Sequence, residues 1–196
     1  MKIPTYLKER YAKKGKFGLA GDIVFILLIL VMLIPSWRRD VGSLLVKPFM
    51  RSPSATIEEK IPLLQSDFEM TFISLDKHRF QLSDFTEKPI FLTWWATWCH
   101  HCVAELSQLQ QLSNNSSSDA HILILTNEDP AHVKQFLESR GYSIPIYVVT
   151  GYNGGNLNAN SLPTSFVIDK SGTIVYKKTG ATKWGSDEFG LFLRGL

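Results

Sequence analysis

The 196-residue sequence contains only two cysteines, and this scarcity excludes several classes of protein. Cys99 and Cys102 lie too close together to staple distant parts of a fold, so a disulfide scaffold is excluded. A zinc site made of four thiolates would need a second cysteine pair, which the chain lacks. A lone Cys-x-x-Cys pair therefore favours redox chemistry.

Clustered positive charge is lacking in most of the chain. Residues 1–66 carry 11 Lys and Arg against 5 Asp and Glu, whereas residues 67–196 carry 10 against 13. The net charge of +3 therefore comes from the N-terminal part. A mildly acidic remainder without a basic stripe argues against nucleic-acid binding.

One long apolar run is present near the N-terminus. Residues 17–37 contain Asp22 as their only charge, and about 20 residues in a helix suffice to cross a bilayer. Basic residues dominate residues 1–16, which favours an N-terminus inside the cell. A cleaved signal peptide is the alternative, but no small-x-small cleavage pattern follows the run, so we expect an uncleaved signal-anchor. The sequence predicts a cytoplasmic basic tail over 1–16 and a single transmembrane anchor over 17–37.

Residues 38–66 collect proline and serine without periodicity, which is typical of a linker, and residues 67–196 form the expected folded domain. A hairpin is predicted from Thr71–Leu75 and Arg79–Leu82. Further strands are expected at Pro89–Trp95, His121–Thr126, Ile144–Thr150, Thr164–Asp169 and Thr173–Lys178. Helices are expected from Cys99 to before the polar stretch 114–118, over Pro130–Arg140, and within Trp184–Leu196. This order predicts an α/β domain with a mixed sheet and helices on both faces.

The cysteine pair follows the strongest predicted strand and opens a helix. A helix N-terminus favours a thiolate, because its N–H groups are unsatisfied and its dipole is positive there. Cys99 is therefore the predicted nucleophile. Cys102 lies one turn further on, on the same stripe as Leu106 and Leu109, so we expect it to be more enclosed and to resolve mixed disulfides.

His100 and His101 fill the positions between the cysteines, where an imidazole can stabilise the thiolate by its charge or by a hydrogen bond. The same Cys/His turn offers soft-metal ligands, so a copper or zinc site is an alternative. Adjacent positions in one helical turn do not easily converge on one ion, which disfavours that alternative.

Three further side chains are candidates for the site. Glu105 lies beside the inward stripe, where a buried carboxyl could relay the proton of Cys102, although a surface glutamate is an equal alternative. Trp98 precedes the nucleophile and is expected to shield it or to contact substrate. Pro163 begins a predicted strand, where a proline indicates an edge or a turn and could also be cis.

The segment Trp-Ala-Thr-Trp-Cys-His-His-Cys, with the later Leu-Pro-Thr at 162–164, resembles the thioredoxin superfamily. More narrowly, it is similar to the membrane-tethered TlpA/ResA/DsbE-type thiol-disulfide oxidoreductases of bacteria, over roughly residues 67–182. The resemblance implies a thioredoxin fold, in which helices flank a mixed central sheet. It also implies the N-terminal hairpin and an inserted strand and helix over His121–Gly141, all preceded here by one transmembrane helix.

The resemblance also implies roles for single residues. Pro163 is expected to be cis against the dithiol, and the backbone of Leu162 to pair with bound substrate. An acid at the position of Glu105 is expected to tune the thiols. His101 matches the histidine of strongly oxidising DsbA-type sites, whereas the family usually has proline between its cysteines.

The predicted function is therefore a periplasmic protein disulfide oxidoreductase, anchored in a bacterial inner membrane, with Cys99 and Cys102 as its redox disulfide. The reducing direction is slightly favoured, with electrons received from a membrane redox partner. A disulfide-forming oxidase and a metal-binding module are the alternatives. Protein thiols and disulfides are the expected substrates, the bilayer is contacted through residues 17–37, and no cofactor is expected.

Overall fold

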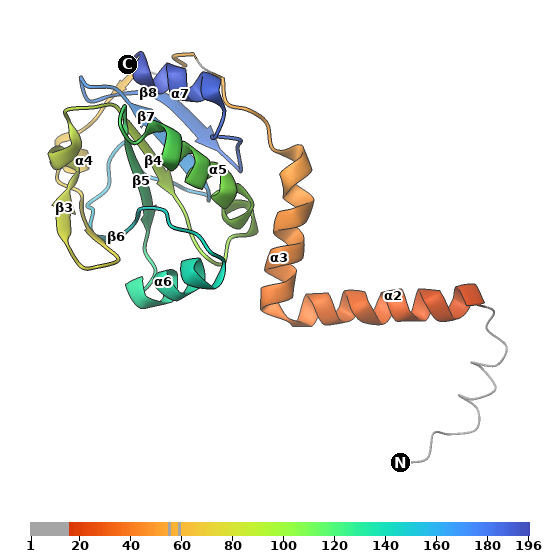
Figure 1. Ribbon diagram of the computed structural model, residues 1–196. Helices are drawn as coiled ribbons and strands as arrows, with labels where there is room; N and C mark the ends of the chain where they lie inside the picture. Colours follow the sequence, from red (N-terminus) through yellow and green to blue (C-terminus); the bar gives the residue numbers. More distant parts are fainter. Residues whose placement is uncertain (1–15, 55, 59) are drawn as a thin grey trace. The chain divides into compact units, whose positions relative to one another are not determined.

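A computed structural model of the chain describes residues 16–54, 56–58 and 60–196 (Figure 1). The chain divides into two compact units, Met1–Val41 and Gly42–Leu196. The predicted basic tail lies, up to residue 15, outside the described residues. The second unit contains both cysteines.

The apolar run near the N-terminus is divided between two helices. Helix α2 covers Lys16–Leu33, and helix α3 covers Pro35–Val46. Pro35 stands at the first position of α3, where its missing N–H and fixed φ are tolerated. In the part of the chain that the structure describes, no helix is long and apolar enough to cross a membrane. The single transmembrane helix predicted over 17–37 is therefore not shown.

The second unit is built on a mixed sheet of eight strands in the order β1-β8-β7-β4-β5-β6-β2-β3. The strands are β1 (Ile61–Pro62), β2 (Thr71–Ser74), β3 (Arg79–Gln81), β4 (Ile90–Trp94), β5 (His121–Thr126), β6 (Ile146–Gly151), β7 (Thr164–Ile168) and β8 (Thr173–Thr179). Strands β4, β5 and β6 run parallel to one another, and β7 is antiparallel to β4. The two hairpins predicted from the sequence, β2–β3 and β7–β8, are confirmed.

Two apolar cores lie on opposite faces of this sheet, because successive side chains of a strand alternate between faces. Phe91 of β4 belongs to the first core, and its neighbours Ile90 and Leu92 belong to the second. Helices α5 (His100–Ser116), α6 (Pro130–Ser139) and α7 (Asp187–Arg194) pack on the first core. Figure 1 shows these three helices on one side of the strands.

The second core is covered by shorter elements. They are the short helix α4 (Gln65–Phe68), the 3-10 helix η2 (Leu82–Phe85), the β2–β3 hairpin and part of the connection between β6 and β7. The long helices therefore share one face of the sheet, whereas the sequence predicted helices on both faces. The reason is that β4, β5 and β6 are parallel neighbours, so their crossover helices α5 and α6 follow the same hand and the same face.

Part of the predicted linker is folded. It contains the end of α3, the 3-10 helix η1 (Lys47–Phe49) and strand β1, which pairs with β8. The N–H of Glu58 donates to the carbonyl of Val175, and the N–H of Leu63 donates to that of Gly172. The sequence of residues 38–66 did not predict these contacts, because they are made with β8 and the turn before it, far along the chain.

Helix α5 is longer than predicted. It continues through Asn114 and Asn115 to Ser116, where the polar composition predicted a loop. Gln110 explains part of this extension, since its amide donates to the side chain of Asn114 and to the carbonyl of Ser143. Tertiary contact therefore overrides the weak helix propensity of the asparagines.

Candidate active site

Cys99 lies between the carboxyl end of β4 and the first turn of α5. It is the N-cap of α5, and its Sγ accepts a hydrogen bond from the N–H of Cys102 at 3.3 Å. The same Sγ lies 3.7 Å from the carbonyl oxygen of Leu162, to which its thiol can donate. The chain thus brings the predicted nucleophile and the Leu162-Pro163 segment together, and the peptide bond between those two residues is cis, as the resemblance implies.

The hydrogen bonds at the helix start stabilise the Cys99 thiolate. The Cys102 thiol is the main cause, and the backbone N–H groups of Cys102 and His101 add to it. They lower the pKa of Cys99 to about 7, although burial acts in the opposite direction. At neutral pH the Cys99 thiol is therefore ionised more readily than an ordinary cysteine.

Cys102 is the more enclosed of the two thiols. It is 0% exposed, against 7% for Cys99. Burial is the main cause that raises the pKa of Cys102 far above its ordinary value, and the Cys99 sulfur raises it further. The nucleophile is itself more buried than the sequence led us to expect, because its Sγ points toward Leu162 rather than into solvent.

Both histidines between the cysteines are exposed, and their ring centroids lie 4.4 Å apart. Burial lowers the pKa of His101, and the neighbouring His100 lowers it further. It is the backbone N–H of His101 that helps to lower the pKa of Cys99. A tuning role for the two imidazoles stays a prediction. Among the described residues, no group of three or more His, Cys, Asp or Glu is arranged to hold a metal ion.

Glu105 is a fully buried carboxyl beneath the dithiol. Its Oε2 accepts hydrogen bonds from the indole N–H of Trp184 at 3.2 Å and from the N–H of Thr182 at 3.3 Å. Its Oε1 is buried without a hydrogen-bond partner among the described residues. Burial raises the pKa of Glu105 to about 8 despite those two hydrogen bonds, and the charge of Cys99 raises it further. The surface alternative for Glu105 is wrong, because the carboxyl is fully buried, and its raised pKa favours the protonated form.

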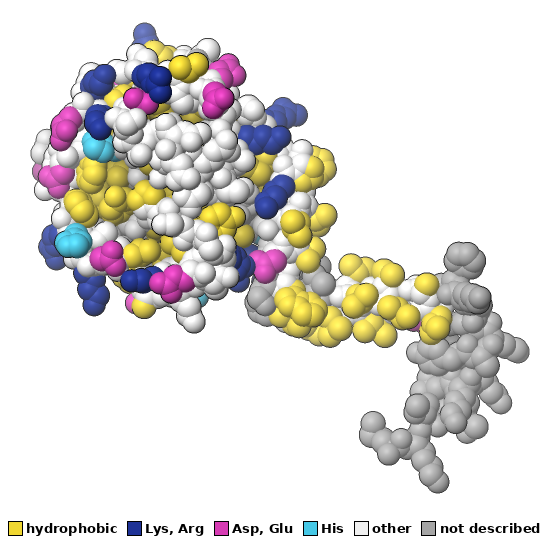
Figure 2. Space-filling model, viewed as in Figure 1, with side chains coloured by type: hydrophobic (Ala, Val, Ile, Leu, Met, Phe, Trp, Pro, Cys, Tyr) yellow, Lys and Arg dark blue, Asp and Glu magenta, His cyan; other side chains and the backbone are white. Residues whose placement is uncertain are grey.

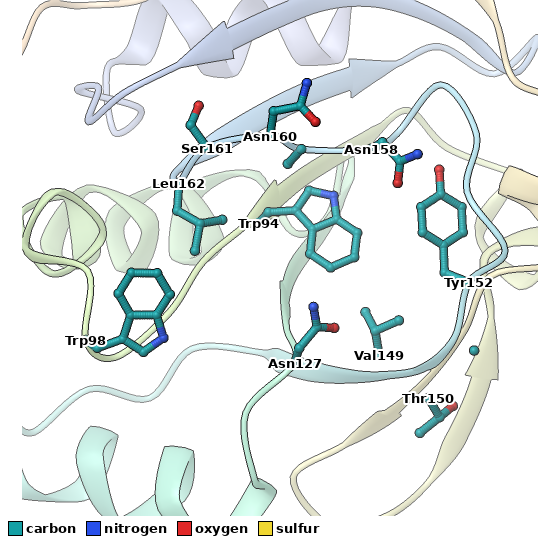
Figure 3. Close-up of a pocket in the computed structure, with 12 residues that line it drawn as sticks. Trp94, Trp98, Asn127, Val149, Thr150, Tyr152, Asn158, Asn160, Ser161 and Leu162 are labelled. Carbon is teal, nitrogen blue, oxygen red and sulfur yellow. The ribbon is translucent and has the colours of Figure 1, made fainter.

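A pocket opens beside Leu162 at the carboxyl ends of β4, β5 and β6. It has a volume of about 570 Å³, and Trp94, Trp98 and Leu162 are among its lining residues. Figure 3 shows Trp98 and Leu162 at one end, Tyr152 at the other and the indole of Trp94 between them. Trp98 is 66% exposed, so its indole is available to a substrate. The substrate-contacting roles of Trp98, Leu162 and Pro163 stay predictions.

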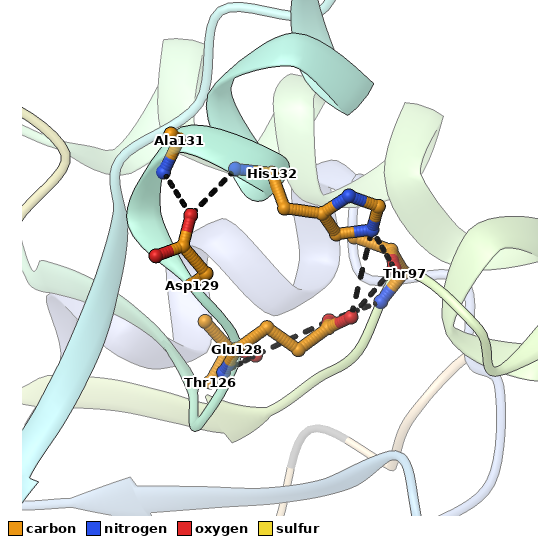
Figure 4. Close-up of polar contacts among 6 residues, drawn as sticks. All are labelled: Thr97, Thr126, Glu128, Asp129, Ala131 and His132. Atoms are coloured by element: carbon orange, nitrogen blue, oxygen red, sulfur yellow. Dashed lines mark hydrogen bonds and ion pairs between the residues drawn. The ribbon is translucent and has the colours of Figure 1, made fainter.

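A polar cluster holds the loop that leads into Cys99, and the sequence did not reveal it. The carboxylate of Glu128 accepts hydrogen bonds from the N–H and the hydroxyl of Thr97, both at 2.6 Å (Figure 4). His132 Nε2 lies 3.2 Å from the same hydroxyl and 4.0 Å from Glu128. In this region the sequence predicted only the helix that begins at Asp129-Pro130. The contact of Glu128 with Thr97 could not be predicted, because it depends on the parallel pairing of β4 with β5.

Comparison with known proteins agrees with this geometry. The family model described as Redoxin matches residues 57–191. The thiol-disulfide oxidoreductase ResA of Geobacillus kaustophilus is 33% identical over 122 residues, which cover 58% of this chain and 66% of ResA. The chain thus spans just under two thirds of that relative.

Two solved structures share the fold. The exposed lipoprotein thioredoxin Etrx1 of Streptococcus pneumoniae matches 64% of this chain and 98% of its own, with a TM-score of 0.51 and 24% identity. A thiol:disulfide interchange protein of Chlorobium tepidum matches 70% of this chain and 97% of its own, with a TM-score of 0.53 and 22% identity. The resemblance to the thioredoxin superfamily, and to its ResA-type members, is confirmed.

The lowered pKa of Cys99 predicts the pH dependence of its alkylation. Because only the thiolate reacts, the rate of reaction with iodoacetamide should rise about tenfold per pH unit below pH 7 and level off above it. Cys102→Ala removes the side chain that is the main cause of the lowered pKa of Cys99, so in this variant the inflection should move upward. Cys99→Ser is the control and should react very slowly throughout. A wild-type inflection near pH 9 would contradict this assignment.

The buried carboxyl of Glu105 predicts a pH-dependent stability. Unfolded Glu105 ionises near pH 4.5, whereas the folded group keeps its proton up to about pH 8. The folded state therefore binds more protons in this window, and the free energy of unfolding should fall as pH rises through it. Urea unfolding of Glu105→Gln should lack this fall, which amounts to a few kcal/mol because one pKa unit is worth about 1.4 kcal/mol.

The matched control is Glu138→Gln, which removes an exposed carboxyl on α6. Its stability should follow that of the wild type at every pH. Both variants keep the two thiols, so titration of Cys99 cancels in the comparison. Parallel curves for Glu105→Gln and the wild type between pH 5 and pH 8 would disprove the burial effect.

Proposed function

This chain belongs to the Redoxin family of the thioredoxin superfamily, and we propose that it exchanges disulfides with protein substrates through Cys99 and Cys102. The observation that carries the proposal is the asymmetry of the dithiol. Cys99 has a lowered pKa, and its Sγ lies 3.7 Å from the Leu162 carbonyl, whereas Cys102 is fully buried. An easily ionised thiol next to a protected one suits two-step exchange.

In the reducing direction, the Cys99 thiolate attacks one sulfur of a substrate disulfide. A bond forms between Cys99 and that sulfur while the substrate disulfide breaks, and the other substrate sulfur leaves as a thiolate and takes up a proton. Cys102 then loses its proton and attacks the Cys99 sulfur. The Cys99–Cys102 disulfide forms while the bond between Cys99 and the substrate breaks, and this second substrate sulfur leaves as a thiolate and takes up a proton. The substrate has then gained two electrons and two protons.

Glu105 is suited to assist the second step, in which Cys102 attacks the Cys99 sulfur. Cys102 must be deprotonated although its burial opposes this, and Glu105 is a buried group with a pKa of about 8 that interacts electrostatically with Cys102. A carboxyl with a pKa close to the working pH can both accept and return a proton. We propose that Glu105 relays the proton of Cys102.

Two observations favour opposite directions of electron flow. The resemblance to membrane-tethered ResA-type proteins favours reduction of extracytoplasmic disulfides, with electrons supplied by thiols of a membrane redox partner. The lowered pKa of Cys99 favours the oxidising direction, because a stable thiolate stabilises the reduced form. We propose the reducing direction, with a disulfide-forming oxidase as the alternative.

The reduction potential of the Cys99–Cys102 pair separates these directions. Equilibration of the full chain with glutathione should give a potential of about −270 mV for a reductant, whereas about −120 mV would mark an oxidant. The wild type should also reduce insulin with dithiothreitol as electron donor, and Cys99→Ser should not. The absence of a reversible couple, or equal insulin reduction by Cys99→Ser, would contradict the proposed function.

We further propose that the chain is attached to a bacterial membrane and works outside the cytoplasm, in the periplasm where that compartment exists. The support lies in α2, where the side chains of Ile23–Leu30 are all apolar and between 39% and 64% exposed. Figure 2 shows these apolar side chains along the helix. So large an unpartnered apolar surface is typical of a membrane or protein contact.

Cell fractionation tests this attachment. The full chain should sediment with membranes, and Ile26→Asp combined with Ile29→Asp should release it, because charges in an apolar contact are costly. Leu191→Asp is the control, since Leu191 is also exposed but lies on α7. Protease added to spheroplasts should digest the dithiol domain of the wild type. Protection of that domain, or a soluble wild type, would refute the proposed location.

A further inference from the structure

The loop between β4 and α5 leads the chain into Cys99. Trp95 begins this loop, and its N–H donates to the carbonyl of Leu125 in β5 at 2.8 Å. The indole N–H of Trp95 donates to the carbonyl of Cys102 at 3.0 Å. Trp98, directly before the nucleophile, is 66% exposed. The start of the loop is thus fixed on the sheet, whereas the last residue before Cys99 faces solvent.

Thr97 ties the second half of the loop to Glu128. One carboxylate oxygen of Glu128 accepts the N–H of Thr97, and the other accepts its hydroxyl, both at 2.6 Å. Thr97 is 1% exposed, so water does not compete for these hydrogen bonds. Two charge-assisted hydrogen bonds to one residue fix its orientation as well as its distance. Thr97 is therefore ordered by a side chain that lies 31 positions further along the chain.

Glu128 is itself ordered by the end of β5 and the start of α6. Its N–H donates to the hydroxyl of Thr126, the last residue of β5, at 3.3 Å. Nε2 of His132 lies 3.2 Å from the hydroxyl of Thr97 and 4.0 Å from Glu128 (Figure 4). Asp129, the N-cap of α6, accepts the N–H of His132 at 3.1 Å and so fixes the first turn of that helix. Because both elements hold Glu128, it can in turn hold the loop.

We propose that Glu128 is a positioning residue, which acts through Thr97 to keep Cys99 at the N-cap of α5. The inference rests on the proposed function and adds a residue to its machinery. Cys99 follows Thr97 by two positions, so a shift of Thr97 moves the sulfur relative to the N–H of Cys102, which it accepts at 3.3 Å. The Cys102 thiol and that N–H both lower the pKa of Cys99. Displacement of the loop therefore weakens the contacts that stabilise the thiolate.

A positioning role and a purely electrostatic role of Glu128 predict opposite changes at Cys99. A carboxylate that acted by its charge alone would oppose ionisation of the thiol, so its removal would make the thiolate easier to form. Removal of a positioning residue does the reverse, because the sulfur loses hydrogen bonds that favour its ionised form. The direction of the change therefore separates the two roles.

Alkylation of the reduced full chain with iodoacetamide, followed across pH, measures this direction. Glu128→Ala should move the inflection of the Cys99 alkylation rate upward by about one pH unit, the effect of losing one hydrogen bond to a charged group. Below the inflection, the rate should then fall about tenfold. Glu128→Gln should move the inflection upward by less, because a glutamine carbonyl still accepts the N–H of Thr97.

The matched control is Glu138→Ala, which removes an exposed carboxyl of α6 and should leave the inflection unchanged. All variants keep Cys102, Glu105 and the two histidines between the cysteines, so these titratable groups around Cys99 are the same throughout. Mass spectrometry of the digested protein assigns each label. Cys102 is 0% exposed, so it should stay unlabelled while the protein is folded. An upward shift with Cys102 unlabelled therefore does not come from unfolding.

Substitutions of Thr97 test the same contact from its other side, and they suffice if Glu128→Ala does not fold. Thr97→Val removes the hydroxyl that donates to Glu128 and keeps the N–H, so it should move the inflection upward by less than Glu128→Ala does. Thr97→Ser keeps the hydroxyl and should match the wild type. In the double variant, Glu128→Ala should add less to Thr97→Val than it does alone, because both changes remove one shared contact.

A downward shift or an unchanged inflection in folded Glu128→Ala would overturn the inference. An unchanged inflection in Thr97→Val, or full additivity of the two substitutions, would overturn it as well. Each of these results leaves disulfide exchange by the wild type intact. Failure of the wild type to reduce insulin with dithiothreitol would instead refute the proposed function.

Discussion

The sulfur of Cys99 caps the first turn of α5, and the rest of the site is arranged around that contact. A thiolate at this position accepts the N–H of Cys102 at 3.3 Å, a donor that no helical carbonyl could satisfy. The same contact starts the helix at His100 and turns Cys102 toward the core. The chemical difference between two identical side chains, three positions apart, thus follows from where one helix begins.

The pairing of the strands brings distant residues to the dithiol, which the start of one helix cannot do. Parallel pairing of β4 with β5 places Glu128 against Thr97, which holds the loop before the nucleophile. Antiparallel pairing of β4 with β7 places Leu162 beside Cys99. Glu128 and Leu162 therefore reach the site from the ends of the two strands that flank β4. This arrangement costs stability at one point, because one oxygen of the buried Glu105 accepts no hydrogen bond from any residue that the structure describes.

Local patterns in the sequence were sufficient for much of this description. The dithiol at a strand-to-helix junction, both hairpins and strand β5 followed from residue order and periodicity, and β5 has the bounds that were predicted. The burial of Glu105 was undecided because a helix position beside the inward stripe can face either way. Its contact with Trp184 comes from the far end of the chain, which periodicity does not reveal.

Other features depended on contacts between distant segments. The hydroxyl of Tyr152 and the N–H of Leu157 donate to Asp67 and thereby fix the connection between β6 and β7, although nothing in the local sequence marks that aspartate. The extension of α5 through its asparagines depends on Gln110 and Ser143. In the apolar run near the N-terminus, Pro35 lay inside the predicted anchor over 17–37 and instead opens α3.

The central claim is that Cys99 attacks and Cys102 resolves. Trapping tests it directly: reduced Cys102→Ser and reduced Cys99→Ser are each mixed with the same disulfide-linked peptide, and the products are identified by mass spectrometry. We predict that Cys102→Ser accumulates a stable mixed disulfide on Cys99, and that Cys99→Ser forms almost none. Equally rapid formation of a mixed disulfide on Cys102 in Cys99→Ser would contradict the claim.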